Sequence, residues 1–372
     1  MIRIPVPVAP RAYDVVVDEG VVARTGAFLR RLFPERQQVF VVTVRPVLRP
    51  WGKVLKQSLQ AAGFRSVFIE TPDGEAHKRL AAVERLATKL LQAGADRKAI
   101  VVAFGGGMVG DLAGLTASLY MRGVDLVNVP TTVLGQVDAS VGGKTAVNLR
   151  SGKNMLGTFY QPAVVLSDPS VLATLSPREY RSGLYEALKA GVIGSPALFR
   201  CFVEEREKIM VRDPETLRFV ISESVRVKAR IVAADEREDG LRRVLNLGHT
   251  VGHALEVQTR YRLLLHGEAV AWGMIAATHM ATLLGKLDPR VAEVMQNTVF
   301  SLGPLPRVDV RAQSLIEHMR SDKKTEGGAI HLVIPMDVGK VEVVRDVPEG
   351  IIADGIAHMR QLARGQEQVQ VA

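Results

Sequence analysis

The chain has 372 residues, which corresponds to two or three domains at about 150 residues each. Hydrophobic residues make up 47% and charged residues 23%, so widespread disorder is excluded. The single cysteine, Cys201, rules out an intrachain disulfide and a cysteine-based metal site, so any metal must be held by histidines and carboxylates.

The net charge of +9 favours an anionic partner, either nucleic acid, a membrane surface or a phosphorylated metabolite, unless it serves solubility alone. No basic arm or RNA-binding aromatic motif supports nucleic acid. Residues 1–10 do not resemble a signal peptide. The longest apolar stretch, 269–284, is shorter than a span of about 20 residues and contains His279. It predicts a buried helix, and we expect a cytoplasmic protein without membrane partners.

The first half of the chain alternates between strand and helix patterns. Residues 39–43, 66–70, 99–104 and 125–130 are predicted strands, separated by predicted helices at 54–62, 80–93 and 108–120. Residues 13–18 alternate in polarity and predict an edge hairpin. This order is typical of a parallel sheet wrapped by helices.

Beyond residue 172 the pattern becomes mainly helical. Helices are predicted at 178–190, 197–211, 214–234, 247–256, 268–284 and 291–302, and a hairpin joins 330–335 to 340–344. The predicted organisation is therefore a Rossmann-like α/β domain at 1–172 and a mainly α-helical domain at 173–372.

A glycine-rich turn follows the apolar strand at 99–104. Glycines 105, 107 and 110 fit the G-x-G-x-x-G spacing, in which missing Cβ atoms and free helix N–H groups admit a pyrophosphate. A tight strand-to-helix turn without a ligand is the alternative. No acidic ribose ligand follows about 20 residues later, so this is not an ordinary dinucleotide fingerprint.

Three of the eight histidines are clustered in sequence. His249 and His253 lie one helical turn apart, and His266 follows in a polar His-Gly-Glu step. Glu186 and Lys189 share a face of another predicted helix. Two imidazoles and a carboxylate suit Zn²⁺ with an open position, although core or surface histidines remain the alternative. The residue after His249 is not glutamate, which excludes the metalloprotease motif.

Polar segments at 136–145 and 151–155 are either surface loops or a source of cations and amides for an anionic ligand. The run at 322–324, Asp-Lys-Lys, is similar in kind, although a solvated charge run is its simpler interpretation.

At these residues the sequence resembles the 3-dehydroquinate synthase family of the sugar-phosphate cyclase superfamily, over about residues 13–344. The motifs that carry the resemblance are GGGMVGDLAG, RGVDLVNVPTTVLGQVDASVGGKTAVN, GKNMLGTFYQP, REYRSGLYEALKAG, RVLNLGHTVGHALE and HGEAVAWGM. It implies an NAD-binding α/β domain, a helical metal- and substrate-binding domain, a homodimer, and the cofactors NAD and Zn²⁺ or Co²⁺.

The resemblance also implies roles for particular residues. The metal ligands would be Glu186, His249 and His266, while His253 would face the substrate as a proton-transfer or phosphate-side group. Other catalytic positions are matched by Asp138, Lys144, Lys189 and Asn246. Substrate-binding positions are matched by Arg122, Asn154, Arg242 and one of Lys323 and Lys324, with Arg122 reaching the partner subunit. NAD contacts are matched by Glu75, Lys78, Gly105, Gly106, Gly107, Asp111, Thr131, Thr132, Lys144, Lys153 and Thr174.

The implied reaction converts a phosphorylated sugar acid, 3-deoxy-D-arabino-heptulosonate 7-phosphate, into 3-dehydroquinate and phosphate in the shikimate pathway. Transient oxidation by NAD makes the neighbouring C–H acidic, phosphate leaves, the hydride returns, and an intramolecular aldol step closes the ring. One departure concerns the strand end at 42–46, where the family's acidic ribose ligand is missing and Arg45 leaves room for a 2′-phosphate. We still expect NAD.

Three other functions remain open. A sibling cyclase that forms valiolone- or inosose-type rings usually alters positions that are intact here, namely Lys153, Asn154, Asn246 and His253. A metal-dependent alcohol dehydrogenase would accumulate NADH. A non-catalytic nucleotide-binding protein would have no use for the metal and phosphate groups together.

Overall fold

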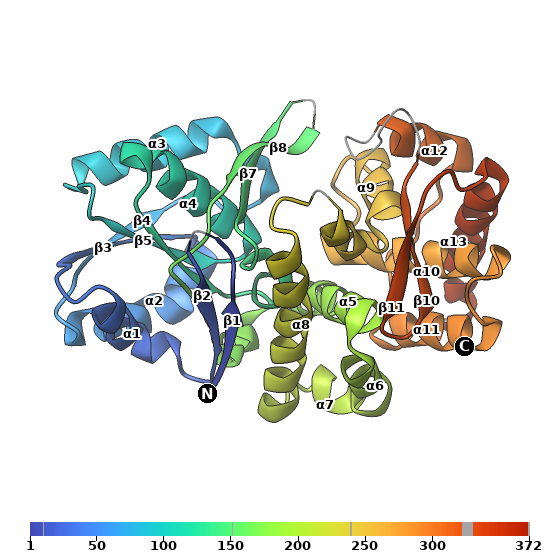
Figure 1. The fold of residues 1–372 in the computed structure, drawn as a ribbon, viewed down its shortest axis with the longest axis horizontal. Helices are drawn as coiled ribbons and strands as arrows, with labels where there is room; N and C mark the ends of the chain where they lie inside the picture. The colour runs from blue at the N-terminus through green and yellow to red at the C-terminus, as the bar shows by residue number, and fades with distance from the viewer. Residues whose placement is uncertain (10, 151, 239, 322–329, 371–372) are drawn as a thin grey trace. The chain divides into compact units, whose positions relative to one another are not determined.

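The computed structural model describes residues 1–9, 11–150, 152–238, 240–321 and 330–370 (Figure 1). It forms two compact units: unit 1 is Met1–Ser176 with Leu217–Arg237, and unit 2 is Pro177–Thr216 with Glu238–Ala372. The chain returns to unit 1 through helix α8 (Pro214–Ala234). The division into functional domains at 1–172 and 173–372 stays a prediction.

Unit 1 is built on a seven-stranded sheet of order β1-β2-β9-β6-β5-β3-β4. Only β1 runs antiparallel to its neighbour, as the predicted edge hairpin requires. Its strands are β1 (Ile2–Val6), β2 (Tyr13–Val17), β3 (Gln38–Thr43), β4 (Arg65–Glu70), β5 (Ile100–Gly105), β6 (Asp125–Pro130) and β9 (Val164–Ser167).

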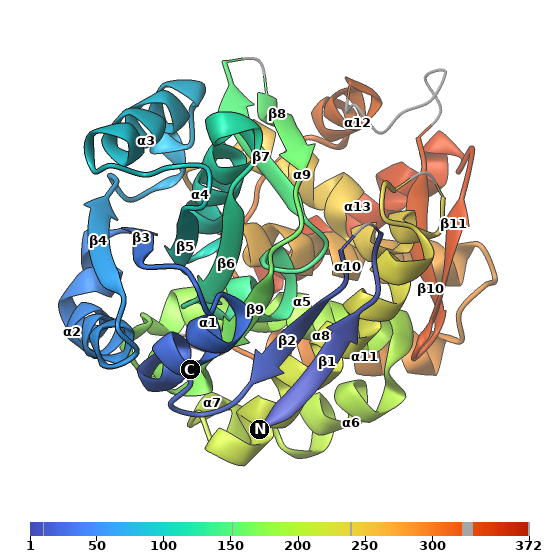
Figure 2. The same cartoon turned by 60° about the vertical axis from the view of Figure 1, so that its left-hand side comes forward.

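Helices cover this sheet because its central strands are apolar on both faces. Phe40 and Val42 of β3 join the core that α3 and α4 form on one face (Figure 2). The helices of unit 1 are α1 (Thr25–Leu32), α2 (Arg45–Ala61), α3 (Leu80–Gln92) and α4 (Gly107–Leu119). Short 3₁₀ helices are η1 (Val22–Arg24), η2 (Glu75–His77), η3 (Tyr120–Arg122) and η5 (Pro169–Thr174), and η4 (Gly135–Ala139) is a π-helix. The strand β7 (Lys144–Leu149) pairs with β8 (Gly152–Phe159).

Unit 2 is organised around the buried helix α10 (His266–Leu283), which contacts α5, α9, α11 and α13. Residues 269–284 predicted this helix, and its side chains include the fully buried Trp272. The other elements are α5 (Pro177–Gly194), α6 (Pro196–Glu204), α7 (Arg206–Met210), η6 (Leu241–Asn246), α9 (His249–Gln258), α11 (Pro289–Ser301), α12 (Ala312–Ser321), β10 (Leu332–Asp337), β11 (Lys340–Val344) and α13 (Glu349–Gln370). The predicted fold class, a Rossmann-like α/β part and a mainly helical part, is confirmed.

No helix in the described part of the chain is long and apolar enough to cross a membrane.

Candidate functional site

Three helices of unit 2 bring the predicted metal ligands together. Glu186 lies in the middle of α5, His249 is the first residue of α9, and His266 is the first residue of α10. Nε2 of His266 lies 3.5 Å from Oε1 of Glu186, and Nε2 of His249 lies 3.8 Å from the same oxygen. One donor atom from each residue can be chosen so that all lie within 4.8 Å of one another.

The donor set fits a divalent metal ion. Glu186 is 2% exposed and His249 is 8% exposed, so the protein around these two residues would shield a bound ion from water. Two imidazole nitrogens and one carboxylate leave a fourth position for substrate, which is the composition of catalytic zinc sites. Lys189 forms an ion pair with Glu186 from the next turn of α5 and is itself buried.

His253 lies beside this group. Its ring centroid is 5.3 Å from that of His249 and 6.1 Å from that of His266. With Glu256 and His266 it forms a second arrangement of possible ligands, the only other such group among the described residues.

The start of α10 is tied to α5 by two contacts. Glu268 accepts hydrogen bonds from Nε and Nη2 of Arg178, each 2.7 Å long, and one from the backbone N–H of Leu265. The hydrogen bond with Glu268 is the main reason that the pKa of Arg178 is raised. The backbone N–H of Gly267 donates to Oγ of Ser182, so the turn that carries His266 is fixed against the helix that carries Glu186.

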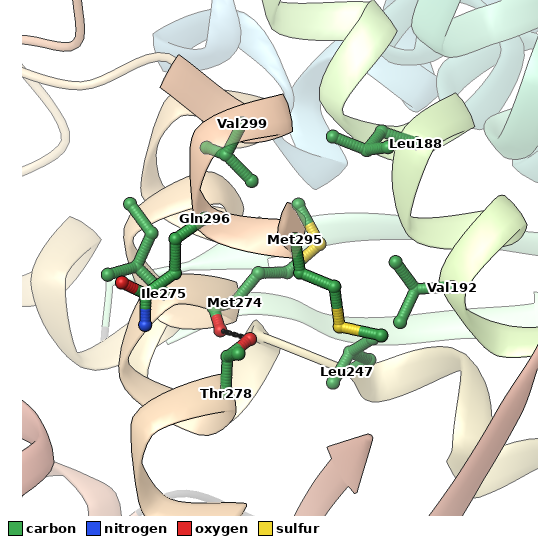
Figure 3. Close-up of a pocket in the computed structure, with 9 residues that line it drawn as sticks. All are labelled: Leu188, Val192, Leu247, Met274, Ile275, Thr278, Met295, Gln296 and Val299. Carbon is green, nitrogen blue, oxygen red and sulfur yellow. Dashed lines mark hydrogen bonds between the residues drawn. The ribbon is translucent and has the colours of Figure 1, made fainter. Parts of the chain in front are cut away.

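A small, mainly apolar cavity lies between helices of unit 2 (Figure 3). It holds about 10 Å³, which is room for about one water molecule, and is lined by α5, α10, α11 and Leu247. Its lining residues are Leu188, Val192, Leu247, Met274, Ile275, Thr278, Met295, Gln296 and Val299. Its size excludes it as a substrate site.

In unit 1, the predicted glycine-rich turn joins β5 to α4. Gly105 ends the strand and Gly107 starts the helix, and both line a small cavity at the carboxyl ends of β5 and β6 with Gly110 and Ser140. A Cβ on Gly106 would come within 2.9 Å of Cγ2 of Thr132, so the turn leaves no space for a side chain there.

Several buried polar atoms near this turn have no hydrogen-bond partner in the described structure. They are the hydroxyls of Thr43, Thr131 and Ser140 and the amide oxygen of Asn128. Buried polar groups are normally satisfied, and the carboxyl edge of a parallel sheet is where such folds bind nucleotides. The turn and these atoms therefore fit a dinucleotide.

A polar network next to the turn joins several predicted cofactor and substrate residues. Lys78 is 4% exposed, forms an ion pair with Asp111, and donates to Oδ1 of Asn154. Asn148, which the sequence analysis did not assign, donates to Oε1 of Glu75 at 2.8 Å and accepts the backbone N–H of Asn154. Burial raises the pKa of Asp111, against the lowering effect of Lys78.

Lys228 on α8 is a residue that sequence reasoning missed. Its Nζ donates to Oδ1 of Asp138 at 2.7 Å and to the backbone oxygen of Asp138 at 2.6 Å. Lys228 is 8% exposed and follows the buried Val225 by three residues. A lysine in the apolar register of a predicted helix was the available signal, because lysine is rarely buried without a partner.

The remaining predicted residues are found at several places. Lys144 starts β7, Lys153 is in β8, and Arg122 ends η3 with a φ of 67°. Thr132 accepts the N–H of Gly135, and Thr174 accepts a hydrogen bond from Trp51. In unit 2, Arg242 is 1% exposed and Asn246 donates to Glu238. Lys323 and Lys324 lie outside the described residues.

Sequence comparisons place these features in one family. The family models for the N-terminal and C-terminal domains of 3-dehydroquinate synthase match residues 68–182 and 183–325. The chain belongs to the 3-dehydroquinate synthase family. A 3-dehydroquinate synthase of Koribacter versatilis is 47% identical over 98% of this chain and 99% of its own. A 3-dehydroquinate synthase of Solibacter usitatus is 44% identical over 93% of this chain and 96% of its own.

Solved structures of two other enzymes have a similar fold. A 2-epi-5-epi-valiolone synthase from Streptomyces hygroscopicus, with NAD⁺ and Zn²⁺ bound, is 27% identical with a TM-score of 0.87, covering 96% of this chain and 99% of that one. A 2-deoxy-scyllo-inosose synthase in complex with carbaglucose-6-phosphate, NAD⁺ and Co²⁺ has a TM-score of 0.85 at 24% identity, covering 97% and 99%. This second likeness concerns the fold alone.

Proposed function

We propose that this chain converts 3-deoxy-D-arabino-heptulosonate 7-phosphate into 3-dehydroquinate and phosphate, in the shikimate pathway of aromatic amino acid biosynthesis. The observation that carries the proposal is the group of Glu186, His249 and His266, with Glu186 and His249 buried, in a chain 47% identical, over nearly its whole length, to a 3-dehydroquinate synthase. Identity to the sibling cyclase that forms valiolone is only 27%, which favours the heptulosonate reaction.

Two cofactors fit the residues present. Glu186, His249 and His266 would hold Zn²⁺ or Co²⁺, and the turn at Gly105–Gly107 with Thr131 and Thr132 would hold NAD, assisted by Glu75, Lys78, Asp111, Lys144, Lys153 and Thr174. The metal would supply a Lewis acid at a substrate oxygen, and NAD a reversible hydride acceptor.

The cationic side chains of the chain would bind the two anionic groups of the substrate. The cationic side chains are those of Arg122, Lys144, Lys189, Arg242 and one of Lys323 and Lys324, and Asn154 would add a neutral amide donor. Hydrogen bonds from ionised donors to phosphate and carboxylate are about twice as strong as neutral ones. The net charge of +9 includes these groups.

Proton transfer would fall to His253, assisted by Asn246. An imidazole changes its charge near neutral pH, so His253 can both accept and return a proton in one cycle. Asp138 would orient the reacting hydroxyl, and Lys228 holds Asp138 through one hydrogen bond to its carboxylate and one to its backbone oxygen.

The test is to incubate the metal-loaded protein with the heptulosonate phosphate and NAD. Equimolar phosphate and dehydroquinate without net NADH are expected. No turnover of this substrate, with turnover of sedoheptulose 7-phosphate, would assign the chain to the sibling cyclases; NADH accumulating with a simple alcohol would make it a dehydrogenase. Glu186→Ala should lose metal and activity together.

We also propose that the protein is a cytoplasmic homodimer. Arg122, at the end of η3, would then complete the partner subunit's phosphate site. Mixing inactive Arg122→Ala chains with inactive Glu186→Ala chains should restore part of the activity in the hybrid dimers, and a strictly monomeric protein by light scattering would contradict this.

A further inference from the structure

One face of α9 carries three chemically active side chains. His249, His253 and Glu256 follow one another at spacings of four and three residues, so they share that face. Glu256 is 3% exposed. A carboxylate that leaves water needs a hydrogen-bonding partner, because its desolvation is costly.

His266 is one such partner, and its two ring nitrogens contact two different carboxylates. Nδ1 lies 3.4 Å from Oε2 of Glu256, and Nε2 lies 3.5 Å from Oε1 of Glu186. A neutral imidazole has one N–H and one lone pair. The contact with Glu256 therefore decides which nitrogen can bind a metal.

His249 is arranged in the same way. Its Nδ1 lies 3.1 Å from the backbone oxygen of Leu247, a group that can only accept a hydrogen bond, while its Nε2 faces Glu186. Both predicted ligand histidines thus have an acceptor at Nδ1 and Glu186 near Nε2.

We propose that Glu256 is a positioning residue for the metal site. It accepts a hydrogen bond from Nδ1–H of His266, which fixes the orientation of the ring. The lone pair of Nε2 is then directed at the side of Glu186, and Nε2 becomes a stronger metal ligand. The inference rests on the proposed metal site and assigns a role to a residue outside the ligand set. Partners of this kind typically change metal affinity 10- to 100-fold.

The alternative is that Glu256 binds a metal directly, with His253 and His266. That arrangement uses Nδ1 of His266 as the ligand, so the ring proton moves to Nε2 and the ring no longer offers a lone pair to the side where Glu186 and His249 meet. The geometry favours the first arrangement, since Nε2 of His266 and Nε2 of His249 lie 3.5 Å and 3.8 Å from the same oxygen, Oε1 of Glu186.

The test measures Zn²⁺ affinity of the metal-free protein by competition with a chromophoric chelator, so it does not depend on turnover. Glu256→Ala should weaken Zn²⁺ binding about 10- to 100-fold. Glu256→Gln keeps the volume and one acceptor oxygen, and should lose less than Glu256→Ala. Gln258→Ala, on the same helix with an exposed side chain that contacts His318, is the matched control and should bind like the wild type.

Two further measurements separate positioning from a purely structural role. In ¹H–¹⁵N spectra of the metal-free protein, His266 should carry its proton on Nδ1, and Glu256→Gln should increase the fraction protonated on Nε2. The visible spectrum of the Co²⁺ form should change in Glu256→Gln and remain as in the wild type in Gln258→Ala, while the melting temperature in chelator stays unchanged for both.

Wild-type Zn²⁺ affinity in both Glu256 variants would overturn the inference. So would two bound ions per chain, one of them lost in Glu256→Gln, because Glu256 would then be a ligand. If Glu186→Ala retains wild-type affinity, the proposed metal site itself fails. If only Glu186→Ala loses metal, the site stands and the role of Glu256 does not.

Discussion

Replacing Gly267 with alanine tests whether the metal site depends on the contact between α5 and α10. A Cβ built on Gly267 would lie 1.8 Å from the backbone oxygen of Ser182, whereas real Cβ contacts essentially never fall below 3.0 Å. The start of α10 and the backbone at Ser182 on α5 must therefore separate by at least 3.0 − 1.8 = 1.2 Å. His266 is the neighbouring residue on α10, and Glu186 lies one turn after Ser182 on α5.

A displacement of this size exceeds what a metal site tolerates, since metal–ligand distances hold to about 0.2 Å. We expect Gly267→Ala to weaken Zn²⁺ binding at least about tenfold and to destabilise the metal-free protein by about 1–3 kcal/mol through overpacking. Gly350→Ala is the matched control: Gly350 is also the second residue of its helix, lies in unit 2, and has open space around its Cβ position.

Chelator competition and thermal unfolding in chelator measure the two effects separately. Gly350→Ala should leave Zn²⁺ affinity unchanged and stability equal or slightly higher. Gly267→Ala with wild-type affinity would refute the argument, because it would show that the ligands do not depend on how closely these helices approach.

Three further predictions concern single residues. Gly110→Ala adds a Cβ that meets no protein atom within 4 Å but lies in the small cavity of the glycine turn. We expect helix stability to rise by about 0.5–1 kcal/mol and NAD binding, measured by fluorescence titration, to weaken; unchanged NAD affinity would contradict the cofactor assignment. Lys228→Met removes the two hydrogen bonds that Lys228 donates to Asp138 and should lower kcat/KM about 10- to 100-fold, because charged hydrogen bonds are worth about 1.5–3 kcal/mol. Steady-state kinetics giving wild-type values would remove Lys228 from the site. His279 and His358 stack with ring centroids 4.0 Å apart, and burial lowers the pKa of both below 6.5; the unfolded chain then binds more protons near pH 6, so their contribution is complete above pH 6.5 and is lost as the pH falls below it. The melting temperature of His279→Phe should accordingly fall less between pH 7 and 5 than that of the wild type, and parallel curves would exclude the pair as the cause.

The regular elements were predictable where local signals agree. The predicted helix 214–234 has the observed bounds of α8, since a proline opens it and apolar residues repeat at helical spacing. The predicted helix 197–211 is instead two helices, because the backbone at Glu205 leaves the helical region with φ −112° and ψ 22°. Helices α12 and α13 were missed, although Leu315, Ile316 and Met319 form a buried stripe on α12.

The hairpin β7–β8 shows where strand patterns fail. Its segments were expected to be surface loops or ligand-binding polar stretches, since glycines interrupt them. The strand β8 exposes Met155, Leu156 and Phe159, so it lacks the alternation of buried and exposed side chains that identifies a strand with one covered face. Backbone pairing with β7 forms this strand without such a pattern.

Spacing alone could place His249 and His253 on one helix face and Glu186 on another helix, but it could not show that they meet. The assignment of the ligand set came from the family resemblance. The three predicted ligands are separated by 249 − 186 = 63 and 266 − 249 = 17 residues, so only packing between helices brings them together. Glu256 was missed although it follows His253 by three residues. A carboxylate in helical register with two histidines was the available signal.

The ligand group depends on atoms that residue type does not reveal. The backbone oxygen of Leu247 lies within hydrogen-bond distance of Nδ1 of His249. The hydroxyl oxygen of Ser182 accepts a hydrogen bond from the backbone N–H of Gly267, next to His266. Either contact could be lost without changing any predicted ligand, yet each controls where a ring nitrogen points. A metal site of this kind is therefore specified by its supporting hydrogen bonds as much as by its ligands, and substitutions at the supporting positions are the more discriminating experiments.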